Sequence, residues 1–297
     1  MKTYFRSHHC EHCEKGYDPT FPVCPACGEP NGSLRDVHAF DHHVHEIIPF
    51  QITYILIQTI GLFVIGFVLT IAVEIGFFSF HPGATADEAL AYMQSVGVNF
   101  GLNSAGYLAV TIAFALIFAI RKRFGELFRS FRKWQNYVFG IIGGGLIVLF
   151  TYLYGLALTG IFNAAGFPQP GPNHNELLVR EMVRAFPVLS ILVFGVVGPM
   201  TEEIGYRVGL FGFGSRLGKW VAYLASALIF AFVHFDSTAL GSGDNARIIV
   251  EFANLPSYIG AGLLLGFLYD RFGLATSYTA HVVNNLVSLV TTLAGGQ

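Results

Sequence analysis

The chain has 297 residues, of which 53% are hydrophobic and 12% are charged, and its formal net charge is −2. Soluble domains carry roughly 25% charged residues, so this deficit excludes an ordinary soluble protein and predicts an integral membrane protein. The net charge by itself distinguishes little, whereas the positions of the charges are informative.

All four cysteines lie in the first 46 residues, a polar and histidine-rich stretch. The pairs Cys10–Cys13 and Cys24–Cys27 each enclose two residues, and ten residues separate the pairs. Four thiolates at this spacing suit a tetrahedral structural zinc ion, and the same ligands also suit iron. Because a module this short has too little core to fold without metal, we predict a zinc-ribbon-like head over residues 1–46. Four cysteine ligands leave no open coordination position, which favours docking or regulation over catalysis.

The histidines around these cysteines are weaker metal candidates. They are His8, His9, His12, His38, His42, His43 and His45. We interpret the stretch HAFDHHVHE as a solvated linker that anchors the chain at the membrane interface. The head has no short apolar core before a small-residue cleavage site, so we expect no secretory signal peptide.

Seven apolar segments follow, each predicted to be a helix because lipid cannot satisfy open backbone groups. They cover about residues 47–79, 100–120, 136–163, 186–213, 219–235, 248–270 and 274–294. Crossing a bilayer needs roughly 20 residues, so 219–235 is at the short end, and eight crossings remain an alternative. The stretch His174–Arg184 alternates charged and apolar residues and predicts an interfacial amphipathic helix. The expected fold class is an all-α multi-spanning membrane protein with about seven transmembrane helices and a small N-terminal zinc ribbon.

The positions of the basic residues predict the orientation. The loop Arg121–Lys133 holds six of them, and the positive-inside rule places it in the cytoplasm. Seven crossings then place the head, Arg216, Lys219 and Arg271 on the same side, which gives 13 of the 17 basic residues. A cytoplasmic head argues against disulfides. Glu251 begins a span near the opposite face and is given a structural interpretation.

Polar side chains interrupt three of the last apolar segments. They are Glu202, Glu203 and Arg207, then His234, and finally His281 with Asn285. Ionisable residues inside a membrane span are costly and are functional by default. Glu203 and Arg207 are four residues apart and can pair on one helix face, which leaves Glu202 about 100° away without that partner.

Helix rise places these clusters at a similar depth. At 1.5 Å per residue, Glu202 lies ~21 Å from Arg216, His234 ~22 Å from Lys219 and His281 ~15 Å from Arg271. Each cluster alone has a structural interpretation, such as a packed histidine, an ion-pair staple or a bridging asparagine. Three clusters at one depth instead predict a shared site.

The ordered motifs on these segments resemble those of the CAAX-processing and bacteriocin-processing (CPBP, or Abi) family of intramembrane proteases. Glu202-Glu203-x-x-Tyr206-Arg207 is similar to its EExxxR motif, Phe230-x-x-x-His234 to FxxxH, and His281-x-x-x-Asn285 to HxxxN. The resemblance covers about residues 186–290, which we expect to be the catalytic core of a membrane domain spanning 47–297. It does not extend to the head.

The resemblance implies hydrolysis of a peptide bond in a membrane-associated protein or peptide. It implies that Glu202 is the general base, that His234 orients the water, and that His281 and Asn285 stabilise the oxyanion, with Glu203 and Arg207 in support. The general chemistry agrees, since imidazole and amide donors stabilise a developing oxyanion. Two histidines and a glutamate also form a zinc ligand set, so catalytic zinc remains open, although we favour a metal-independent reaction.

Two other functions remain open. A transporter also uses ionisable groups at mid-depth, but it predicts inverted repeats, which the sequence does not show. A non-catalytic scaffold would act through the head and a cytoplasmic partner. We expect a plasma membrane of a bacterium or archaeon, contact with the lipid bilayer, and no nucleic-acid partner.

Overall fold

The computed structural model describes residues 8–10, 12–17, 23–29 and 46–295, so residues 38–45 of the predicted linker lie outside the described residues. The last residue of that stretch, Glu46, is fully buried, so the interpretation as a solvated linker was wrong at this end. A two-stranded antiparallel sheet pairs His8 with Tyr17 and His9 with Gly16 in the head. The elements in chain order are β1 His8–His9, β2 Gly16–Tyr17, α2 Ile48–Leu56, η1 Ile57–Gly61, α3 Leu62–Phe80, α4 Ala86–Met93, α5 Val96–Ile120, α6 Phe124–Leu127, η2 Ser130–Arg132, α7 Trp134–Ala164, α8 His174–Ala185, α9 Pro187–Leu192, η3 Val193–Val197, α10 Gly198–Glu203, η4 Ile204–Phe211, α11 Gly212–Gly214, α12 Lys219–Phe232, η5 Ser237–Gly241, α13 Asn245–Phe272 and α14 Leu274–Leu293.

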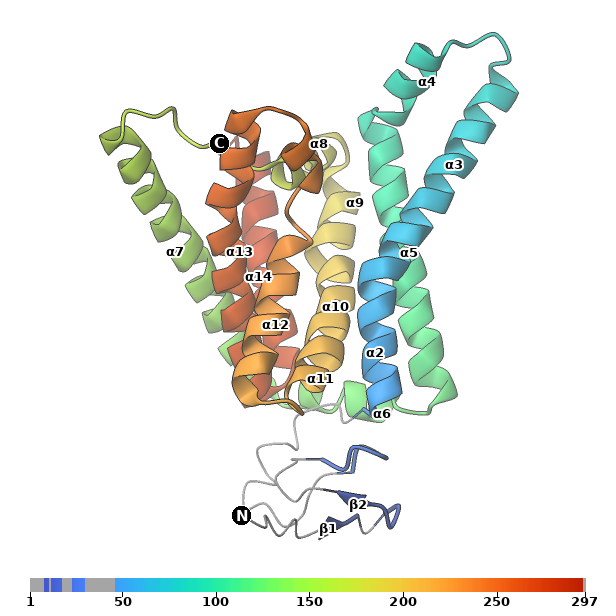
Figure 1. Ribbon diagram of the computed structural model, residues 1–297, viewed down its shortest axis with the longest axis vertical. Helices are drawn as coiled ribbons and strands as arrows, with labels where there is room; N and C mark the ends of the chain where they lie inside the picture. The colour runs from blue at the N-terminus through green and yellow to red at the C-terminus, as the bar shows by residue number, and fades with distance from the viewer. Residues whose placement is uncertain (1–7, 11, 18–22, 30–45, 296–297) are drawn as a thin grey trace, which may run out of the picture.

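The long helices run side by side along one axis and form a bundle (Figure 1). The head strands and α6 lie at one end of the bundle, and α4 and α8 lie at the other. The basic loop and the head therefore share one side, as the charge pattern predicts. Which side faces the cytoplasm stays a prediction.

Five helical stretches of the described chain are long and apolar enough to cross a membrane. They are Ile48–Phe80, Val96–Ile120, Trp134–Ala164, Pro187–Gly214 and Asn245–Phe272. This confirms an all-α membrane protein, whereas the number of crossings remains a prediction, because α14 is more polar and α12 is shorter. The expected helix over 219–235 was wrong at its end: α12 stops at Phe232 after 14 residues, or ~21 Å, against a ~30 Å hydrocarbon core.

The predicted amphipathic helix is α8, which begins where the Asn173 side chain accepts a hydrogen bond from the Glu176 N–H. Its Met182 and Val183 side chains are buried in a cluster with Phe100 of α5 and Leu289 of α14. The helix therefore packs onto the end of the bundle with its apolar face.

Glycines of α7 allow α14 and α13 to approach closely. A Cβ at Gly140 would meet Thr279 at 2.5 Å, one at Gly144 would meet Val283 at 2.6 Å, and one at Gly143 would meet Leu268 at 2.5 Å. Close packing of this kind is typical of membrane helices. A Cβ at the neighbouring Gly145 would meet nothing within 4 Å, so this glycine makes no such contact.

The stretch Pro187–Gly214 is one continuous helical path with two π-helical turns, η3 and η4. Pro199, which cannot donate a backbone hydrogen bond, closely follows η3, and π turns often mark functional positions. Gly205 and Gly209 bring this path against α2 and η1, since a Cβ would meet Gln58 at 2.5 Å and Tyr54 at 3.1 Å respectively. The same path carries Glu202, Glu203 and Arg207, so close packing fixes their position.

A buried polar cluster joins the start of α2 to the end of α5 and to the chain just after α11. The carboxylate of Glu46 is fully buried, accepts a hydrogen bond from the Tyr54 hydroxyl at 2.9 Å and pairs with Arg121 at the end of α5. Arg216, just after α11, donates to the Gln51 side chain at 2.9 Å and to the Glu46 carbonyl. The start of α2 is thereby joined to both the second span and the carboxylate-bearing helix.

Candidate active site

A buried ion pair lies next to the other polar side chains of the site. Arg207 Nε lies 3.2 Å from Glu203 Oε2, and neither side chain is exposed to solvent. Arg207 also donates to the Ser226 hydroxyl on α12 at 2.5 Å. The i,i+4 pairing predicted from spacing is present, and the hydrogen bond to Ser226 joins this helical path to α12.

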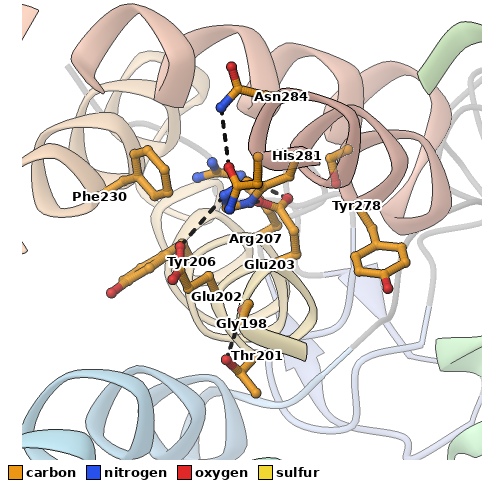
Figure 2. A network of polar contacts seen from close by, with 12 residues as sticks. Gly198, Thr201, Glu202, Glu203, Tyr206, Arg207, Phe230, Tyr278, His281 and Asn284 are labelled. Atoms are coloured by element: carbon orange, nitrogen blue, oxygen red, sulfur yellow. Dashed lines mark hydrogen bonds and ion pairs between the residues drawn. The ribbon is translucent and has the colours of Figure 1, made fainter. Parts of the chain in front are cut away.

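His281 from α14 connects the two glutamates (Figure 2). Its Nδ1 lies 3.1 Å from Glu203 Oε1, and its Nε2 lies 3.8 Å from Glu202 Oε2. A carboxylate can only accept a hydrogen bond, so Nδ1 carries a proton, and Nε2 is the ring nitrogen that faces Glu202. Glu203 therefore sets the tautomer and the orientation of the histidine.

Glu202 is buried beside this pair and is held by a residue from another span. The hydroxyl of Tyr107 on α5 donates to Glu202 Oε1 at 2.9 Å. Glu202 Oε2 is buried and has no hydrogen-bond partner in the described chain. One carboxylate oxygen is thus occupied and the other is presented toward His281.

His234 lies in the turn just beyond α12 rather than inside a helix. Its Nδ1 lies 2.7 Å from the Phe230 carbonyl, which leaves Nε2 as an acceptor, and its ring stacks on Tyr258 at 4.6 Å between centroids. The ring of Phe230 contacts both histidines, at 4.9 Å from His234 and 5.6 Å from His281. The two imidazoles therefore share one aromatic neighbour.

The turn that carries His234 is fixed by two buried polar side chains. Asn173 donates from its side-chain amide to the His234 carbonyl at 3.1 Å. The carboxylate of Glu251 accepts from the backbone N–H groups of His174 at 2.9 Å and Asp236 at 3.0 Å. Glu251, which the sequence places at the start of a span, is buried and joins α13 to the start of α8 and to the His234 turn.

Asn285 lies one helical turn after His281. Its amide donates to the Phe194 carbonyl at 3.0 Å, and its Oδ1 accepts from Asn284 at 3.2 Å. Phe194 belongs to η3, where the π turn changes the regular hydrogen-bond ladder. One amide hydrogen of Asn285 is therefore committed to the protein and one remains.

Within residues 8–10, 12–17, 23–29 and 46–295, the group of three or more His, Cys, Asp or Glu side chains with all ligand atoms within 4.8 Å is the cysteine cluster of the head. Glu202, His234 and His281 offer ligand types that zinc accepts but do not form such a group, although His281 Nε2 lies 3.8 Å from Glu202 Oε2.

The region that carries the three motifs is similar to a known protein family. Residues 184–287 match the family model described as type II CAAX prenyl endopeptidase Rce1-like. This segment is similar to the Rce1-like family. The resemblance to CAAX-processing proteases is confirmed for the region that carries the three motifs. No curated protein and no solved structure was found to match the chain.

Two polar groups of the site lie outside the Rce1-like segment. Tyr107 and Asn173 come from α5 and from the cap of α8, and sequence reasoning missed both. Tyr107 is one of 13 tyrosines, and its only sequence signal is a hydroxyl-bearing residue inside an apolar span. The Rce1-like segment is therefore completed by helices that precede it.

The four predicted metal ligands of the head do come together. Their Sγ atoms lie within 4.8 Å of one another, with 3.4 Å between Cys10 and Cys27 and 3.6 Å between Cys13 and Cys24. Each pair lies in the same kind of turn, since the N–H of Glu14 donates to the Cys10 carbonyl and that of Gly28 to the Cys24 carbonyl, both at 2.8 Å. Glu14 and Gly28 have φ values of 57° and 79° in these turns.

Burial and the backbone of the turns both change the pKa values of the cysteine thiols. Burial raises the pKa values of Cys24 and Cys27, and at Cys27 the neighbouring thiols raise it further. At Cys10 burial acts in the same direction, but the backbone N–H groups of Cys13 and His12 outweigh it and lower its pKa to about 7. Backbone donors of this kind stabilise thiolates, which are the metal-binding form.

Proposed function

We propose that the chain is an intramembrane endopeptidase that hydrolyses a peptide bond of a membrane-associated protein or peptide. The observation that carries the proposal is the buried Glu202 Oε2, which has no hydrogen-bond partner in the described chain and faces His281 Nε2 at 3.8 Å inside the Rce1-like segment. A buried carboxylate with one free oxygen is a strong acceptor for a water proton.

In the proposed reaction, Glu202 Oε2 accepts a proton from a water molecule whose oxygen attacks the scissile carbonyl carbon. Nε2 of His234 is an acceptor and orients the same water through its second hydrogen. The carbonyl π bond becomes the oxyanion of a tetrahedral intermediate. When the intermediate collapses, the C–N bond breaks, and Glu202 returns its proton to the leaving amine.

The oxyanion would be stabilised by the remaining amide hydrogen of Asn285 and by His281. His281 donates from Nε2 only if both ring nitrogens already carry protons when the reaction begins, because Glu202 keeps the proton that the attacking water releases until the leaving amine takes it. Arg207 balances the charge of Glu203, so these two residues support the site without touching the reacting atoms.

The proposal is tested with the full chain in proteoliposomes. Wild type, Glu202→Gln and the distant control Glu181→Gln are incubated with a library of membrane-anchored peptides, including prenylated C-terminal sequences, and products are identified by mass spectrometry. We expect cleavage by wild type and Glu181→Gln and none by Glu202→Gln. Equal cleavage by all three variants contradicts the role of Glu202, and solute flux without cleavage favours the transporter.

We also propose that the head, residues 1–46, binds a structural zinc ion through Cys10, Cys13, Cys24 and Cys27 on the cytoplasmic side. The spacing of the sulfurs supports this, since Zn–S bonds of about 2.3 Å place tetrahedral sulfurs roughly 3.8 Å apart. Elemental analysis is expected to find one zinc per chain, lost in Cys10→Ser/Cys24→Ser. Iron in its place, with visible absorption, contradicts the zinc assignment.

The remaining expectations complete the proposal. A membrane domain over residues 47–297 with its catalytic core in 186–290 would cross the plasma membrane about seven times, in a bacterium or archaeon. Adding a strong chelator to the cleavage assay tests the metal question, because Cys10→Ser/Cys24→Ser already lacks the head metal. Activity of that variant that survives the chelator supports metal-independent catalysis.

A further inference from the structure

The hydrogen bond between Tyr107 and Glu202 joins residues 95 positions apart in the sequence. Tyr107 is on α5, outside the Rce1-like segment, and its hydroxyl meets Glu202 Oε1 at 2.9 Å. The other oxygen, Oε2, has no hydrogen-bond partner among the described residues and lies 3.8 Å from His281 Nε2. The contact therefore distinguishes the two oxygens of the proposed base.

The Tyr107 ring is itself held against the helix that carries Glu202. A Cβ at Gly198, one turn before Glu202, would lie 3.3 Å from the Tyr107 ring. The ring also meets Phe194 edge to face at 6.3 Å between centroids. Gly198 thus leaves room for the ring beside η3, where Phe194 also accepts the hydrogen bond from Asn285.

This arrangement constrains the carboxylate in a way that packing alone does not. The terminal torsion of a glutamate is broad and roughly two-fold, so a free carboxylate exchanges its oxygens easily. A hydroxyl donor on Oε1 opposes that rotation and keeps Oε2 toward His281. A donor held in place before the reaction begins is what a preorganised site requires.

We propose that Tyr107 is a positioning residue of the active site, whose hydroxyl holds Glu202 with Oε2 directed at the reacting water. The proposal rests on the proposed peptidase function. It assigns part of the active site to α5, a helix that the family match does not include.

The test compares Tyr107→Phe with Tyr154→Phe in the full chain. Tyr154 is a matched control, because its hydroxyl also joins two helices, donating to the Ala253 carbonyl at 2.6 Å, but it does not contact Glu202. We expect Tyr107→Phe to lower kcat about 10- to 100-fold with KM unchanged, because a hydrogen bond to a charged group is lost. Tyr154→Phe should retain kcat. A raised KM with normal kcat, or equal kcat losses in both variants, overturns the proposal.

A second measurement does not depend on activity. Infrared difference spectra between wild type and Glu202→Gln isolate the carboxyl band of Glu202, and that band should shift in Tyr107→Phe and stay in Tyr154→Phe. An unshifted band overturns the positioning role even if the wild type cleaves peptides. A shifted band together with no cleavage by the wild type would support the Tyr107–Glu202 hydrogen bond but contradict the proposed peptidase function.

Discussion

Two helical stretches of this protein, Ile48–Phe80 and Pro187–Gly214, are both long and apolar enough to cross a membrane, yet they differ in what surrounds them. Only 6% of the most apolar window is buried in the first, against 56% in the second. The first stretch leaves most of its side chains open to lipid and packs against the bundle mainly through Gln51, Tyr54 and Gln58.

The difference shows where a membrane protein can place ionisable groups. Glu202, Glu203 and Arg207 all lie in the stretch that protein surrounds, where they reach partners on α5, α12 and α14. Apolar composition identifies both stretches as membrane helices, but burial distinguishes the scaffold from the site.

The largest effect on stability is expected at a buried ion pair. Two i,i+4 Glu–Arg pairs, one buried and one near the surface, allow a direct comparison. Arg207 pairs with Glu203 in full burial, whereas Arg180 pairs with Glu176 on the surface of α8 at 2.7 Å. Arg207→Met leaves the buried Glu203 carboxylate without its guanidinium partner and should lower the free energy of unfolding by ~3–5 kcal/mol. Arg180→Met should cost about 0.5 kcal/mol or less. Unfolding in detergent measures both, and equal losses would contradict the assigned burial.

A second prediction compares neighbouring glycines of α7. Gly144→Ala inserts a methyl group against Val283 and the Ala280 carbonyl, and should cost about 1–3 kcal/mol of stability. Gly145→Ala meets nothing within 4 Å and should be close to neutral. The same unfolding measurement decides, and a larger loss at Gly145 would mean that α7 is rotated.

A third prediction concerns the turn that carries His234. Gln in place of Glu251 has one acceptor oxygen for two backbone N–H groups, so one donor is left unpaired at a cost of ~1–3 kcal/mol. We expect Glu251→Gln to lower both stability and kcat. The exposed control Glu181→Gln should change neither, and an unaltered kcat in Glu251→Gln would separate the turn from catalysis.

The smallest effect is expected at the cap of α4, outside the long helices. The backbone N–H and the hydroxyl of Thr85 hold the pKa of Glu88 below its ordinary value. A lowered pKa means that the cap contributes fully above the ordinary value and is lost as the pH falls through the lowered one. Hydrogen exchange over residues 86–93 should therefore show weaker protection at low pH, and Glu88→Ala should remove that dependence. Unchanged pH dependence in Glu88→Ala would contradict the capping role.

Several features could be predicted because they depend on local spacing. The Glu203–Arg207 pair follows from helix periodicity, and the cysteine cluster follows from two short turns. The meeting of His281 with the glutamates was expected from depth alone. A contact between residues four apart lies within one helix, so its prediction does not depend on how that helix is rotated against its neighbours.

Other features depend on tertiary packing, which spacing does not reveal. Gly144 and Gly145 are adjacent, and only the rotation of α7 decides which one meets α14. The end of α12 before His234 is set by Asn173 and Glu251, two residues from other elements. The role of Tyr107 depends on α5 lying beside Glu202, a contact that no sequence spacing encodes.

The central claim is that Glu202 directs a water molecule to a peptide bond, and the most direct measurement is hydrolysis in ¹⁸O-labelled water. The new carboxyl terminus of the product is analysed by mass spectrometry for wild type and for Glu202→Gln in proteoliposomes. We predict one ¹⁸O atom per product from the wild type and no product above background from Glu202→Gln. Labelled product formed at equal rates by both proteins would contradict the claim.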